Sequence, residues 1–92
     1  MKKAIEAKFY KSLNGFMSVK NWLKALPKMS RKIIGEDIQT VEMGWLIGML
    51  VARSLGKKLW EVRSDLPNGT ARIIFVIIEN PMILLHGFIK KT

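Results

Sequence analysis

The 92-residue chain has no cysteine, which excludes a disulfide scaffold, a thiolate metal site and a cysteine nucleophile. It has one histidine, His86, and no acidic cluster at ligand spacing, so the residues for a metal centre are missing. It contains no P-loop, no Gly-x-Ser-x-Gly elbow and no paired carboxylates, and Gly44 and Gly48 lack the third glycine of a dinucleotide site. The sequence therefore predicts neither a metal nor a cofactor.

Long apolar runs are also missing. The longest, residues 44–52 and 73–78, are too short to span a bilayer. Charges at Glu6, Lys8 and Lys11 interrupt any segment that would resemble a signal peptide. We therefore expect a cytoplasmic protein without a membrane partner. The length predicts a single domain that comprises the whole chain.

Acidic residues are scarce, with seven Asp and Glu against sixteen Lys and Arg and a net charge of +9. An excess this large on a small domain favours an anionic partner, which can be nucleic acid, an acidic protein or a membrane surface. A soluble basic protein that binds no polyanion is the alternative. Apolar residues make up 49% of the chain, so it is globular rather than disordered.

The N-terminal half predicts one strand followed by two helices. Residues 4–10 alternate between apolar and polar side chains, as in a half-buried strand. A first apolar stripe with helical spacing follows a Ser18 N-cap and is ended by Pro27. A second follows a Ser30 N-cap and is stopped by Gly44. The stripes are Val19, Trp22, Leu23 and Leu26, and then Ile33, Ile34, Ile38 and Val41.

The C-terminal half predicts three strands, at residues 59–65, 70–78 and 82–89. The turn Leu66-Pro67-Asn68-Gly69 joins the first two, and its Asn-Gly pair is a strong hairpin signal. Residues 45–52 are apolar without a clear period, and we interpret them as irregular. The order β-α-α-β-β-β indicates an α+β fold with a mainly antiparallel sheet and both helices on one face. The opposite face then meets solvent or a partner.

The predicted hairpin places two arginines on that opposite face. Arg63 alternates with Trp60 and Val62, which we expect to face the core. A loop of two or four residues gives Arg63 and Arg72 the same parity, whereas a three-residue loop separates them. Arg72 is the only charge in its strand, so it needs a carboxylate, water or a phosphate. A cross-strand pair with Asp65 or Glu61 satisfies it as well as a ligand does.

A cationic group without a metal remains as the candidate site: Arg53, Arg63, Arg72, Lys90 and Lys91. Such a group can cleave RNA, because the reaction needs a base for the 2′-hydroxyl, cations for the extra phosphate charge and an acid for the leaving oxygen. A lysine crowded by other cations can have its pKa lowered enough to act as the base. The same group can equally bind a phosphate backbone without reaction. His86 is interpreted as a hydrogen-bonded, partly buried strand residue.

Several short blocks form a recognisable series. They are Arg31-Lys32-Ile33-Ile34-Gly35-Glu36-Asp37-Ile38, Gly44-Trp45, Gly48-Met49, Arg53-Ser54-Leu55, Leu59-Trp60-Glu61-Val62-Arg63, Ala71-Arg72-Ile73 and Leu84-Leu85-His86-Gly87-Phe88-Ile89-Lys90-Lys91-Thr92. In this order they resemble the phage-derived, HigB-like toxins of the RelE/ParE superfamily over nearly the whole chain. Relatives have proline at Leu46 and Leu50 and continue beyond Thr92. The RelE-like fold has the element order predicted above.

The resemblance implies the toxin of a type II toxin–antitoxin pair, a ribosome-dependent endoribonuclease that cuts mRNA in the ribosomal A site by 2′-hydroxyl attack. It assigns Arg72 to transition-state stabilisation and Lys90 or Lys91 to acid–base catalysis. The two lysines point opposite ways in a regular strand, so only one is expected to be catalytic. The implied RNA-binding residues are Arg53, Arg63, Lys57 and Lys58.

The implied partner is a cognate antitoxin, whose acidic segment covers the Arg/Lys cluster and which carries a helix-turn-helix DNA-binding domain. Two alternatives remain open on the same fold. One is a ParE-like toxin that binds DNA gyrase and has no nuclease site. The other is an inactive prophage remnant.

Overall fold

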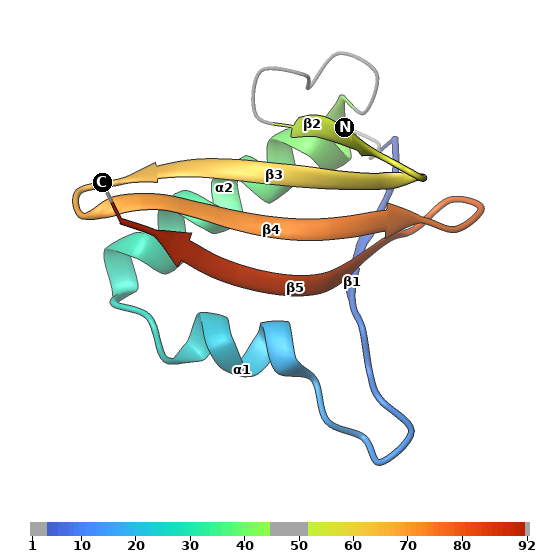
Figure 1. Cartoon of the computed structure of the whole chain (residues 1–92), viewed down its shortest axis with the longest axis horizontal. Helices are drawn as coiled ribbons and strands as arrows, with labels where there is room; N and C mark the ends of the chain where they lie inside the picture. Colours follow the sequence, from blue (N-terminus) through green and yellow to red (C-terminus); the bar gives the residue numbers. More distant parts are fainter. Residues whose placement is uncertain (1–3, 45–51, 92) are drawn as a thin grey trace.

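The computed structural model describes residues 4–44 and 52–91, which form two helices and one five-stranded sheet (Figure 1). The elements are β1 (Ala7–Phe9), α1 (Ser18–Lys24), α2 (Lys28–Met43), β2 (Ala52–Gly56), β3 (Leu59–Leu66), β4 (Gly69–Ile77) and β5 (Met82–Lys90). The strand order across the sheet is β1-β5-β4-β3-β2. Only the β1–β5 pair is parallel among these neighbours, so the sheet is mixed and the α+β class is confirmed.

The predicted element order was wrong in one respect, because it lacks the strand β2. This strand lies at the sheet edge and pairs only with β3, and of its five residues only Ala52 is buried. An edge strand with a single buried residue has no inward–outward alternation for a sequence pattern to detect. The irregular segment predicted at residues 45–52 was wrong at Ala52, which begins β2, and the rest of it, residues 45–51, lies outside the described residues.

Both helices cover the same face of the sheet (Figure 1). Helix α1 packs on β5, and α2 packs on β3. The predicted apolar stripes provide the contacts, because Val19, Ile34 and Val41 are at most 1% exposed. They meet side chains of the central strands, among which Ile73 and Phe75 are equally buried. Neither helix in the described part of the chain has the length and apolar character needed to cross a membrane. We call the face without helices the open face.

The helix ends differ from the prediction at their N-termini. Met17 and Pro27 occupy the N-cap positions, so Ser18 and Ser30 lie inside the helices that they were expected to cap. Proline fixes its own φ and disfavours helical conformation in the residue before it, which separates α1 from α2 at this point. Gly44 is the C-cap of α2, as predicted.

The end of α2 anchors the start of the chain. The main-chain oxygen of Glu42 accepts hydrogen bonds from the N–H groups of Ala4 (2.7 Å) and Ile5 (3.1 Å). The Glu42 carboxylate accepts another from the N–H of Ala7 at 2.7 Å. These bonds use donors that a short edge strand leaves unpaired, and they fix β1 beside β5.

The β3–β4 hairpin closes with a two-residue loop. Leu66 pairs with Gly69, so Pro67 and Asn68 form the turn. With this register Arg63 lies directly opposite Arg72, and Val62 lies opposite Ile73. Val62 and Ile73 are both 1% exposed on the helix side, so the two arginines share the open face. The parity predicted for a two-residue loop is confirmed.

A β-bulge in β5 reverses the parity of the last strand. Phe75 pairs with Leu84, but its neighbour Ile74 pairs with His86, so Leu85 is an extra residue. Leu84 is 2% exposed and faces the helices. In a regular strand His86 would face the helices too, whereas the extra residue turns it to the open face.

Candidate functional site

Three arginines surround one carboxylate on the open face. Arg63 Nε lies 3.8 Å from Glu61 Oε1, and Arg72 Nη1 lies 3.7 Å from Glu61 Oε2. Arg53 on β2 is the register partner of Glu61 and therefore lies on the same face. The Glu61 side chain is 5% exposed although it faces away from the helices. Of the two carboxylates considered as cross-strand partners of Arg72, Glu61 lies within ion-pair distance of it.

The arginine donors are not used up by this carboxylate. Both nitrogen–oxygen distances are longer than those of a hydrogen bond. The arginines and the carboxylate therefore attract each other electrostatically without forming hydrogen bonds. Arg72 Nε is buried and has no hydrogen-bond partner among the described residues. A buried N–H without an acceptor is costly, and a phosphate oxygen is an acceptor that suits a guanidinium. The Arg72 side chain as a whole is 23% exposed, so an anion on the open face can reach its guanidinium.

The bulge in β5 adds three side chains to the same face. Beyond Leu85, His86 pairs with Ile74, Phe88 with Arg72, and Lys90 with Thr70. Successive open-face positions on β5 are therefore His86, Phe88 and Lys90. The rings of His86 and Phe88 have centroids 5.7 Å apart, with a tilt of 31°. The strand thus presents an imidazole, an aromatic ring and an ammonium group in a row.

Arg72, on the neighbouring strand β4, lies opposite the middle of this row. Its direct partner on β5 is Phe88, so His86 and Lys90 are its two diagonal neighbours. Diagonal neighbours in an antiparallel pair are about 7–8 Å apart between Cα atoms, within reach of long side chains. A group bound by the Arg72 guanidinium therefore has one titratable side chain on either side of it.

Three other predicted cations are not among the open-face positions of the strands. Lys57 and Lys58 form the turn between β2 and β3, and both are exposed. That turn is at the opposite end of the sheet from Lys90 (Figure 1). Four residues of β3, about 13 Å, separate Leu59 beside this turn from Arg63. Lys91 follows the last residue of β5 and is exposed.

Two residues of this face were missing from the predicted site. His86 is exposed, so its interpretation as a partly buried strand residue was wrong. The reason is the bulge, which a count of alternating positions does not include. Glu61 was considered only as a partner of Arg72. A signal for it was present, because it is a carboxylate two residues before Arg63 and therefore on the same face of the predicted strand.

A glycine between the two rings allows helix α1 to approach β5. Gly87 faces the helices, and a Cβ at this position would lie 2.6 Å from the Cε3 and Cζ3 atoms of Trp22. The indole therefore packs directly on the backbone of β5.

Comparison with known proteins identifies a family for most of the chain. A search of curated proteins found no match, and neither did a search of solved structures. Residues 21–92, which include α2 and strands β2 to β5, match the family described as "Phage derived protein Gp49-like (DUF891)". The match covers more than half of the chain, including the open-face cluster. The chain therefore belongs to this phage-derived Gp49-like family, which is a family of RelE-like toxins.

Proposed function

We propose that the chain is the HigB-like toxin of a type II toxin–antitoxin pair and that it cuts ribosome-bound mRNA on the open face. The observation that carries this proposal is the position of Arg72 between His86 and Lys90, with Arg63 and Arg53 beside it. Membership of a RelE-like toxin family supports the toxin assignment.

The reaction is an internal transfer that needs no water. The ribose 2′-oxygen attacks the adjacent phosphorus, and the bond from phosphorus to the 5′-oxygen breaks, which leaves a 2′,3′-cyclic phosphate and a free 5′-hydroxyl. One protein group takes the 2′-hydroxyl proton, and another gives a proton to the leaving oxygen. Attacking and leaving oxygens lie on opposite sides of phosphorus, so the two proton-transfer groups belong on opposite sides of the phosphate.

The open face offers groups for each of these roles. The Arg72 guanidinium binds the scissile phosphate and neutralises the charge that builds up on its oxygens. His86 and Lys90 flank it and divide the proton transfers between them. Arg63 and Arg53 bind adjacent phosphates. Lys57 and Lys58 extend the contact along the RNA.

Glu61 acts as a positioning residue in this mechanism. Its carboxylate lies within 4 Å of both Arg63 and Arg72, so it holds two like-charged side chains together in the absence of RNA. A phosphate that binds between the guanidiniums replaces part of this interaction.

The proposed partner follows from the same charge. An antitoxin with an acidic segment, attached to a helix-turn-helix DNA-binding domain, neutralises the arginines and blocks the access of RNA. Such a segment competes directly with phosphate for Arg63 and Arg72.

The test is cell-free translation with the purified protein, in which primer extension maps new mRNA ends. We expect cuts only in translated message, and we expect Arg72→Ala or the combined His86→Ala/Lys90→Ala change to lower the cutting rate at least about a hundredfold. Lys91→Ala is the matched control, because Lys91 lies past the end of β5. Intact message with the wild-type protein would refute the nuclease, and inhibition of gyrase supercoiling would then favour a ParE-like toxin.

A further inference from the structure

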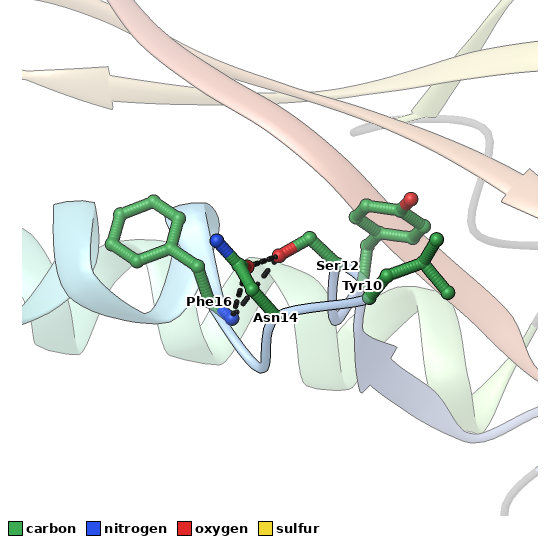
Figure 2. Close-up of a pocket in the computed structure, with 5 residues that line it drawn as sticks. Tyr10, Ser12, Asn14 and Phe16 are labelled. Carbon is green, nitrogen blue, oxygen red and sulfur yellow. Dashed lines mark hydrogen bonds between the residues drawn. The ribbon is translucent and has the colours of Figure 1, made fainter.

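A second surface, far from the arginines, carries exposed apolar side chains. The connection between β1 and α1 contains Tyr10 (47% exposed), Leu13 (fully exposed) and Phe16 (55% exposed). With Ser12 and Asn14 they line a shallow hollow of about 530 Å³ (Figure 2). Single exposed apolar residues are common, but three within seven positions around one hollow indicate a contact surface.

The connection is held in one shape by its own hydrogen bonds. The Ser12 N–H donates to the Phe16 carbonyl at 2.9 Å, and the Gly15 N–H donates to the Ser12 carbonyl at 2.9 Å. The Phe16 N–H donates to Ser12 Oγ at 3.1 Å and to Asn14 Oδ1 at 3.3 Å, and the Ser12 hydroxyl donates to Asn14. Figure 2 shows Tyr10 and Phe16 on either side of these bonds. A partner can therefore contact the side chains of the loop, whereas the N–H groups of residues 12, 15 and 16 already donate hydrogen bonds within the loop.

The charge around this loop has one sign. From residue 7 to residue 35 the chain has seven Lys and Arg and no Asp or Glu. Lys11 within the loop is exposed, as are Lys8 on β1 and Lys20 on α1, and a Cβ at Gly15 would lie 3.7 Å from Lys11 Cε. Like charge opposes the approach of a second copy of this chain. The surface therefore fits an anionic partner that also has apolar groups.

We infer that the apolar loop Tyr10–Phe16, with its rim of lysines, docks an acidic amphipathic segment of a protein partner. Apolar side chains of the segment enter the hollow against Leu13 and Phe16, and its carboxylates face Lys8, Lys11 and Lys20. Nucleic acid is the competing occupant, because Tyr10 and Phe16 carry exposed rings for base stacking, but the fully exposed Leu13 between them and the engaged N–H groups favour apolar protein side chains. The inference is independent of RNA cleavage.

This surface is separate from the candidate nuclease site. The loop follows β1, at one edge of the sheet, whereas Arg53, Arg63 and Arg72 lie on the three strands at the other side. Figure 1 shows the connection from β1 to α1 projecting away from the other strands. A partner segment on the loop leaves the open face accessible, so the two surfaces can be tested independently.

The test uses a labelled synthetic helix of about 16 residues, with leucines along one face and glutamates elsewhere, and measures fluorescence anisotropy with the whole chain. A peptide with the same composition in scrambled order is the probe control. We expect Leu13→Ser/Phe16→Ser to weaken binding of the amphipathic peptide at least about tenfold. Met29→Ser is the matched protein control, because Met29 is an exposed apolar residue of α2 (62% exposed) and should leave affinity unchanged.

Three results would overturn the inference. The first is absence of binding, or equal binding of the scrambled peptide. The second is an affinity that Leu13→Ser/Phe16→Ser leaves unchanged although circular dichroism shows a folded protein. The third is that the same double change lowers affinity for a labelled oligouridine, or dissociates a dimer in sedimentation, which would assign the loop to nucleic acid or to a second copy. Retained mRNA cleavage in this variant is expected, because the loop lies apart from Arg72.

Discussion

The turn between β2 and β3 is strained, and relief of that strain can be measured. Gly56 pairs with Leu59, so Lys57 and Lys58 form a two-residue turn, with φ angles of 53° and 67°. Positive φ at both positions is the type I′ arrangement, for which Asn-Gly is the favoured sequence. A residue with a Cβ costs roughly 1–2 kcal/mol in this conformation. Both lysines are exposed, so no packing is lost when they are replaced.

We expect Lys57→Asn/Lys58→Gly to raise the free energy of unfolding by about 1–2 kcal/mol, after allowance for the freedom that glycine adds to the unfolded chain. For a domain of this size each kcal/mol raises Tm by roughly 4–8 °C. Urea denaturation followed by tryptophan fluorescence gives the free energy directly. An unchanged or lower stability would refute the claim that this turn is strained.

A second double variant separates strain from charge. Lys57→Gln/Lys58→Gln keeps a Cβ at both positions, so its stability should equal that of the wild type. Both double variants remove two cations, and both should therefore weaken RNA binding and reduce its salt dependence by about two counterions. If only the Asn-Gly variant loses affinity, the turn contributes through its shape rather than its charge.

Three further changes test the packing and the electrostatics of the site. Gly87→Ala should lower the free energy of unfolding by about 1–3 kcal/mol through its clash with Trp22, and a double-mutant cycle with Trp22→Leu should recover part of this loss. Glu61→Gln should destabilise by about 1–2 kcal/mol, because two guanidiniums lose their counter-charge, and 1 M salt should reduce the loss by screening their repulsion. Phe75→Ala should cost about 3–5 kcal/mol, since Phe75 is fully buried, and circular dichroism should show it largely unfolded at 37 °C. Wild-type stability of any of these variants would contradict its premise.

The parts of the fold that the sequence predicts are those with strong periodicity. The apolar stripe of α2 and the hairpin that pairs Arg63 with Arg72 depend on side chains that repeat at a fixed spacing. The edge strand β2 has one buried residue, so its pairing with β3 is decided by backbone hydrogen bonds rather than by pattern. Strand order depends on contacts between distant segments, such as the parallel pair of β1 and β5.

The candidate site was predicted less completely than the fold. Arg72 was identified because it is the only charge in an apolar predicted strand, Arg53 and Arg63 because they lie in the same half of the chain, and Lys90 because it follows the last strand. His86 was interpreted as partly buried because no second histidine or acidic cluster accompanies it, and the bulge at Leu85, which turns it to the open face, has no signal in the sequence. The residue types do not reveal where the bulge lies, because Leu84 and Leu85 are both leucines and only Leu84 is buried.

The bulge at Leu85 also has a consequence for how this chain can change over generations. Loss of the Leu85 codon would leave a regular strand with His86 still on the open face, whereas one codon inserted between Leu85 and His86, in a strand that keeps a single bulge residue, would turn His86, Phe88 and Lys90 toward the helices and Gly87 toward solvent. After such an insertion the gene would still encode all the groups of the site, but His86, Phe88 and Lys90 would no longer face a ligand on the open face. For relatives of this chain, the spacing between the buried leucine and the His-Gly-Phe block is therefore as informative about activity as the identity of the residues.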